Sequence, residues 1–139
     1  MATSPVDVVL NALDAVEKRD TARLVQLYHP DIEFHWPPGL PYSGVHRGPA
    51  IAEMTMSFAQ VWVPLQPTDN ERRMEPQIVA AQDADVVVHY RWKGRDAAGN
   101  AFETPTMAHY QVRDRKLARA QMYHYDLIGL ARFVANARP

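Results

Sequence analysis

The segment from Val86 to Lys93 alternates between two faces, and this pattern constrains the fold more than any other feature of the sequence. One face carries only apolar or aromatic side chains, at Val86, Val88, Tyr90 and Trp92, whereas the other carries mostly polar ones. A period of two residues predicts a β-strand with one buried face. The chain must therefore contain a sheet with an apolar side, which other elements have to cover.

Further strands are predicted by alternation or by β-forming composition, and they cover residues 31–36, 71–81, 102–112 and 117–125. The strand at 71–81 is weaker or bulged, because Pro76 cannot donate a ladder hydrogen bond. A polar, Gly-containing loop at 94–100 and a charged turn at 113–116 predict antiparallel neighbours. Residues 37–48 are rich in proline and glycine, and we expect a loop there.

Helices are predicted at the start, the middle and the end of the chain. Ser4-Pro5 begins a helix over 5–18, with serine as N-cap and proline in the first turn. Asp20 caps a short second helix that carries Leu24, Leu27 and Tyr28 and ends at His29-Pro30. Pro49 opens a third helix that ends at Val63-Pro64, and Asp126 is the expected N-cap of a closing helix. This order predicts an α+β fold with helices on one face of a largely antiparallel sheet.

Composition excludes several classes of protein. The 139 residues match a single domain over 1–139, and 15 basic against 16 acidic side chains leave no electrostatic footprint for nucleic acid or a membrane surface. The chain has no cysteine, and its six histidines show no metal-ligand spacing. We therefore expect no metal, no cofactor, no nucleic-acid partner and no membrane partner. The N-terminus lacks the features of a secretory signal, so a cytoplasmic location is expected.

A set of motifs along nearly the whole chain carries a family resemblance. It comprises Lys18-Arg19-Asp20 with Leu24 and Leu27, Asp31 to Trp36, Tyr42 to Gly48 followed by Ala50-Ile51, Val112-Arg113-Asp114 with Lys116-Leu117, and Asp126 to Leu130. In these motifs the chain resembles the nuclear transport factor 2-like superfamily, and especially its SnoaL-like branch. The resemblance implies a cone-shaped fold in which a curved, mixed sheet wraps around N-terminal helices and encloses a pocket.

The catalytic residues of such families do not transfer to this chain. The position of the isomerases' general base is occupied by Trp36, and their two further catalytic positions fall near Ala12 and Ala108. The acid/base carboxylate of SnoaL-type cyclases falls at Met122 or Tyr123. The dehydratases' acid position lies near Glu17, but their histidine position holds Arg72 or Arg73. Any reaction in this chain must therefore use other groups.

The resemblance implies that the concave sheet face lines the pocket. The expected substrate-binding residues are Phe34, Trp36, Tyr42, Val88, Trp92, Ala108 and Met122, and the expected catalytic residues are His124, Asp126, Tyr90 and Tyr110. His124 would act as acid or base, the two tyrosines would orient a substrate oxygen, and Asp126 would tune the imidazole. The simpler alternatives are ordinary core packing for the aromatic residues, a hydrogen-bonded core histidine, and an aspartate that only caps the last helix.

Two functions remain open from the sequence. The first is a cofactor-independent enzyme that acts on a small, largely apolar metabolite, polyketide- or terpenoid-like, by cyclisation, isomerisation, dehydration or hydrolysis. The second is a non-catalytic protein that binds such a molecule; a protein-interaction domain has less support. The opposite, convex sheet face is Arg-rich and aromatic and predicts a homodimer. That face comprises His89, Arg91, His109, Gln111, Arg119, Gln121, Tyr123 and Tyr125.

Overall fold

The computed structural model describes residues 4–137, so residues 1–3 and 138–139 of the predicted domain lie outside the described part. The helices are α1 (Pro5–Glu17), α2 (Thr21–Gln26), α3 (Ala50–Leu65), α4 (Asp69–Arg72) and α5 (Leu127–Ala137). The strands are β1 (Tyr28–Trp36), β2 (Gly44–Arg47), β3 (Gln77–Gln82), β4 (Asp85–Arg95), β5 (Ala101–Arg113) and β6 (Lys116–His124).

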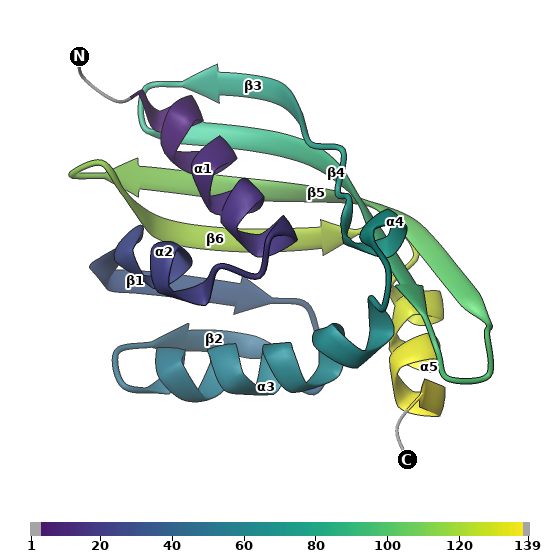
Figure 1. Ribbon diagram of the computed structural model, residues 1–139. Coiled ribbons are helices and arrows are strands. Elements are labelled where there is room, and N and C mark those ends of the chain that lie inside the picture. Colours follow the sequence, from purple (N-terminus) through teal and green to yellow (C-terminus); the bar gives the residue numbers. More distant parts are fainter. Residues whose placement is uncertain (1–3, 138–139) are drawn as a thin grey trace.

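The six strands form one sheet in the order β2-β1-β6-β5-β4-β3. Strand β1 runs parallel to β6, and the other neighbours are antiparallel. Figure 1 shows α1, α2 and α3 on one face of the sheet and α5 at one end of it. The predicted α+β fold, with helices against one face of a curved, mixed sheet, is confirmed.

Burial follows the alternation that the sequence predicted. Along β4, every second residue from Val86 to Trp92 is at most 3% exposed, and along β5 the buried series includes Thr106, Ala108 and Tyr110. Strands β4 and β5 pair without a register shift, and Pro105 lies opposite Arg91 within that ladder. The bulge that proline could have introduced there is absent, so the predicted inward face of β5 is confirmed.

Helix α1 supplies the layer opposite the sheet. Ser4 Oγ accepts a hydrogen bond from the Asp7 amide, and the Asp7 carboxylate accepts one from the Ser4 amide, which is the predicted N-terminal cap. Val8, Val9 and Leu13 of this helix are at most 3% exposed. Because their spacing puts them on one side of the helix, α1 buries an apolar stripe against the sheet.

Two segments differ from the sequence prediction at the start of the sheet. Tyr28 was expected in the second helix but begins β1, because the Leu117 amide donates to the Leu27 carbonyl and draws the chain into the ladder beside β6. Part of the expected loop at 37–48 forms β2, which pairs with β1. An ion pair of 3.1 Å between Arg47 and Glu33 joins these two strands.

A third difference concerns residues 71–76, which were expected to start a strand. Glu71 instead lies in the single turn of α4, where its side chain accepts hydrogen bonds from Thr68 and from Arg95. These bonds lower the pKa of Glu71 to about 2. Strand β3 begins only after Pro76, at Gln77, which agrees with the restriction that proline places on a sheet ladder. No helix among residues 4–137 is long and apolar enough to cross a membrane.

Candidate functional site

An inner cavity of about 80 Å³ lies between the concave sheet face and the helices α1, α2 and α3. Its wall is almost entirely apolar or aromatic. It is lined by Ala12, Leu13, Val16, Leu24, Tyr28, Phe34, Trp36, Met54, Thr55, Phe58, Trp62, Met74, Tyr90, Tyr110, Leu117 and Met122. Sheet residues and helix residues both contribute, so the cavity depends on how the two layers meet.

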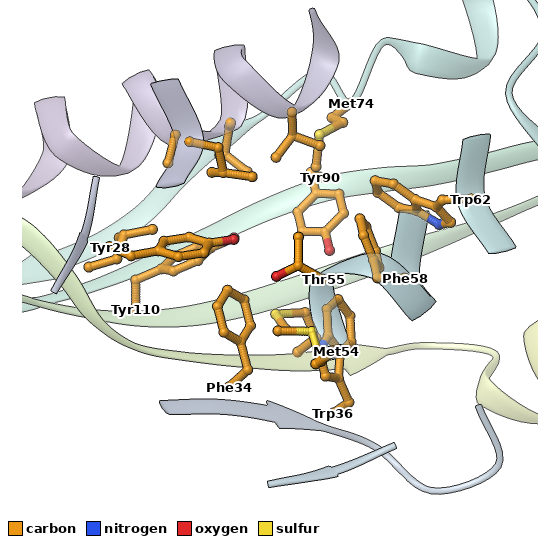
Figure 2. Close-up of a pocket in the computed structure, with 16 residues that line it drawn as sticks. Tyr28, Phe34, Trp36, Met54, Thr55, Phe58, Trp62, Met74, Tyr90 and Tyr110 are labelled. Atoms are coloured by element: carbon orange, nitrogen blue, oxygen red, sulfur yellow. The ribbon is translucent and has the colours of Figure 1, made fainter. Parts of the chain in front are cut away.

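The few polar groups among the lining residues are hydroxyls and the indole N–H groups of Trp36 and Trp62. Figure 2 shows the hydroxyls of Tyr28, Thr55 and Tyr90 directed towards a common central space. Tyr110 belongs to the same wall, on the strand next to Tyr90. The Thr55 hydroxyl also donates to the Ile51 carbonyl at 2.8 Å, as is common for threonine within a helix.

Burial keeps these phenols protonated. It raises the pKa of Tyr28 to about 12, and it raises the pKa of Tyr90 and Tyr110 well above the ordinary value near 10. For Tyr90, the neighbouring phenols of Tyr110 and Tyr42 add to the effect of burial. At neutral pH the wall therefore offers neutral hydrogen-bond donors and no phenolate base.

Aromatic rings form the other side of the cavity. Phe34 and Trp36 are stacked with centroids 6.2 Å apart, Trp36 and Phe58 are stacked at 5.3 Å, and Phe58 is 4.4 Å from Trp62. The Trp36 indole Nε1 donates to the Met54 sulfur at 3.3 Å, which fixes the ring. Flat, immobile rings of this kind bind a planar or alicyclic apolar body well.

No aspartate, glutamate, histidine, lysine or arginine belongs to the sixteen lining residues. The cavity can therefore exclude water, hold an apolar molecule and donate hydrogen bonds to an oxygen. It has no group within its wall that exchanges a proton near pH 7.

The structure brings together only some of the residues predicted for the site. Phe34, Trp36 and Met122 line the inner cavity, as do Tyr90 and Tyr110. The other predicted substrate-binding residues are buried on the same side but do not line it; these are Tyr42, Val88, Trp92 and Ala108. Tyr42 lies behind the wall, with its ring 4.7 Å from Trp36 and 5.3 Å from Phe58.

His124 points inward but is not part of the cavity wall. Its Nδ1 lies 2.8 Å from the Thr106 hydroxyl, and its Nε2 is buried without a hydrogen-bond partner among residues 4–137. Burial lowers the pKa of His124 to about 4, so the imidazole is neutral at pH 7. The side chain is 9% exposed, and this geometry matches the alternative of a hydrogen-bonded core histidine.

Asp126 caps α5. Its carboxylate accepts a hydrogen bond of 2.8 Å from the Gly129 amide, and a Cβ atom at position 129 would overlap this carboxylate. The Asp126 amide donates to the Thr104 hydroxyl at 3.0 Å. Asp126 is exposed and makes no hydrogen bond with His124, so the structure does not bring the predicted pair together.

Sequence reasoning missed most of the cavity residues that come from the helices. Met54, Phe58 and Trp62 recur at every fourth position of α3, and this spacing could have identified one lining stripe. No local signal identified Tyr28, because its place in β1 results from pairing with β6.

Comparison with known proteins identifies the family of this chain. The model of a family described as SnoaL-like domain matches residues 9–120. Among curated protein sequences, none matches significantly.

Solved structures share the fold at low sequence identity. TerC, co-crystallised with polyporic acid, is 20% identical, with a TM-score of 0.78 over 95% of this chain and 99% of that chain. A Xanthomonas campestris protein of unknown function with a cystatin-like fold is 20% identical, with a TM-score of 0.78 over 94% and 97% of the two chains. An NTF2-like protein from Burkholderia thailandensis is 20% identical, with a TM-score of 0.73 over the full length of both chains.

Proposed function

Because the chain belongs to the SnoaL-like domain family, we propose that its inner cavity binds a small, largely apolar metabolite and holds an oxygen atom of that metabolite with tyrosine hydroxyls. The metabolite is of polyketide- or terpenoid-like character. The observation that carries this proposal is the presence of phenols in an otherwise apolar enclosure. Burial and neighbouring phenols raise the pKa values of Tyr90 and Tyr110, so both hydroxyls are protonated and able to donate.

A neutral hydroxyl that faces the cavity can donate a hydrogen bond to an oxygen of a bound molecule. A carbonyl or hydroxyl oxygen suits neutral donors, and the apolar rest of the molecule would contact Phe34, Trp36 and Phe58. The co-crystal of TerC with polyporic acid supports an organic ligand for this fold.

The reaction we propose needs no cofactor and no strong base in the wall. Hydrogen bonds from Tyr90 and Tyr110 would polarise a carbonyl, and the rigid wall would hold one reactive conformer of the metabolite. Cyclisation or isomerisation is compatible with such a site, because both can proceed within one bound molecule. The acid/base role predicted for His124 gains no support from its place behind the wall.

A matched pair of ligands tests the binding proposal. 1-Indanone carries a carbonyl oxygen, whereas indane has the same bicyclic body without it, and both can be titrated by the fluorescence of Trp36 and Trp62. Tyr90→Phe and Tyr110→Phe should each weaken 1-indanone binding by about 2- to 10-fold, the equivalent of one hydrogen bond, and leave indane binding unchanged.

His124→Gln serves as the control and should leave both affinities unchanged. If the tyrosine variants lost the same fold of affinity for indane and for 1-indanone, this would contradict a hydrogen bond from the tyrosines to the ligand. A loss of 1-indanone binding in His124→Gln alone would indicate that His124 contacts the ligand.

The alternative function is non-catalytic binding, and it is favoured by the absence of carboxylate and imidazole groups from the cavity wall. Solvent extraction of the purified protein, followed by mass spectrometry, can recover a bound molecule. Incubating that molecule with fresh protein separates the functions, since an enzyme changes its mass or retention time and a carrier returns it unchanged.

Homodimerisation through the outer sheet face belongs to the same proposal. Tyr123 is 52% exposed and Tyr125 is 85% exposed on this side, and His109 is held 2.7 Å from Asp85. Light scattering at micromolar concentration should give twice the chain mass of 15.8 kDa, and a monomer mass would refute the dimer.

A further inference from the structure

A second, outer cavity of about 90 Å³ adjoins the inner one. The two share five lining residues, which are Val16, Leu24, Thr55, Phe58 and Trp62. The outer cavity also includes Thr21 and Val63, both exposed, whereas every residue of the inner cavity is buried or half-buried. The outer cavity therefore has the more exposed lining of the two, and it lies where α1 and α2 face α3.

The outer cavity differs from the inner one in holding a cationic side chain, Arg19. The Arg19 Nη2 donates to the carbonyl of Gln66 at 2.8 Å and to that of Val63 at 3.4 Å. Its Nε is buried and has no hydrogen-bond partner among residues 4–137. The α1–α2 connection that carries Arg19 thus lies against the C-terminal end of α3 (Figure 1).

A second guanidinium, that of Arg72, lies at the same carbonyl. The Arg72 Nε donates to the same Gln66 carbonyl at 3.1 Å, and its like charge lowers the pKa of Arg19 together with burial, which is the larger cause. Arg19 forms no ion pair with a carboxylate of the described residues. Arg72 reaches only Asp69, at 3.9 Å, and that carboxylate is 88% exposed.

The backbone at Arg19 also favours a different residue. Its φ of 56° lies in the left-handed region, where glycine is the usual choice after a helix. The Arg19 amide donates to the Val16 carbonyl and the Asp20 amide to the Ala15 carbonyl, so the chain ends α1 there. The turn at Arg19 places its side chain in the lining of the outer cavity.

We propose that Arg19, supported by Arg72, binds a carboxylate of the ligand, so that the molecule held in the inner cavity is an amphipathic acid with an apolar body. This inference rests on the proposed function of the inner cavity. A carboxylate in the outer cavity would pair with the Arg19 guanidinium and offset the repulsion between the two guanidinium groups. The five shared lining residues place the two cavities side by side, and the inference requires one ligand to extend from one into the other.

Two probes of equal shape test the inference. 3-Phenylpropanoate carries a carboxylate, and 3-phenylpropanamide replaces it with a neutral amide. Titrations of the full chain at pH 7.5 and low salt, followed by ¹H–¹⁵N NMR, should give a Kd about tenfold or more lower for the carboxylate. The preference should shrink as salt is added.

Arg19→Gln should bring the two Kd values together and leave the amide's Kd unchanged, and Arg72→Gln should reduce the preference partly. Because a ratio of two affinities is measured on the same folded population, it is insensitive to lost stability. Arg47→Gln is the control, since this arginine on β2 pairs with Glu33, and it should keep the full preference.

Equal affinities for the two probes would overturn the inference, as would a carboxylate preference that survives in Arg19→Gln. Binding of the amide alone would refute the carboxylate subsite while leaving the proposed function intact. If neither probe binds up to its solubility limit, the proposed function and the subsite both fail.

Discussion

The concave side of the sheet has a hollow half and a filled half, although both are built from the same buried face of the same strands. In the hollow half, Tyr90 and Tyr110 face open space under α1 and α3. In the filled half, Trp92 is 1% exposed and contacts the rings of Trp62, Phe102 and Phe133.

The difference arises from what covers each half. Helix α5 packs on the filled half, where Leu130 is fully buried and Phe133 meets Trp92 in an edge-to-face contact with centroids 6.1 Å apart. Thr104 and Thr106 there make hydrogen bonds to the Asp126 amide and to His124 Nδ1, so these two hydroxyls have partners within the protein. In the hollow half the polar groups remain available to a ligand, which is why the two halves should respond differently to mutation.

The largest difference should appear on removing one large side chain from each half. Trp92→Ala should lower the free energy of unfolding by about 3–5 kcal/mol, because a closed core loses its largest member. Met122→Ala, at the wall of the cavity, should cost about 2 kcal/mol, since its side chain already lacks contacts on one side. Urea denaturation of both variants measures this, and equal losses would contradict the division into two halves.

A second difference is pH dependence, which should come from the filled half. The pKa of His124 is lowered to about 4 in the folded protein, against 6.5 as the ordinary value. The imidazole therefore favours folding above about pH 6.5, and this contribution is lost as the pH falls from there towards 4.

Between pH 7 and pH 5, the wild type should lose about 2 kcal/mol more stability than His124→Gln, in which nothing titrates at this position. Subtracting the two curves removes the carboxylates that titrate in both proteins. The buried phenols of the hollow half should contribute nothing in this range, so Tyr110→Phe should follow the wild-type curve. Parallel curves for the wild type and His124→Gln would show that the imidazole is not buried as described.

The smallest effect should come from Asp126 at the edge of the filled half. Asp126→Ala removes the cap of α5 and should lower stability by about 1 kcal/mol. It should leave 1-indanone binding unchanged, because the carboxylate does not line the cavity. Asp126→Asn is the matched control, since an asparagine side chain still caps a helix. A change in binding for Asp126→Ala alone would place the carboxylate in the site after all.

Local patterns predicted much of the fold and the correct side of each strand. Alternation in Val86 to Trp92 predicted β4 and its buried face, and Ser4 and Asp126 were identified as helix caps from their own sequence neighbourhoods. The family resemblance predicted the arrangement of the sheet around the helices, which the fold confirms. Tyr28 and β2 were missed, because both depend on pairing with residues distant in the sequence or around a loop.

For the candidate site, the sequence predicted which sheet face each side chain occupies better than it predicted which side chains line the cavity. Phe34, Trp36, Tyr90, Tyr110 and Met122 were expected at the cavity and line it, whereas His124 was expected there and pairs with Thr106 instead. Period-two patterning distinguishes the inner from the outer face of a strand but does not say what covers each residue.

The sequence by itself determined which residues turn away from water, because strand and helix periodicities are local properties of the backbone. Only the tertiary structure decided where those residues enclose a space, since the cavity is the volume that α1, α2 and α3 leave unfilled above the sheet. It also decided that Arg19 and Arg72, 53 positions apart in the numbering, share the Gln66 carbonyl beside that space. This contact of two arginines with one carbonyl depends on packing between layers, so no short-range sequence pattern predicts it.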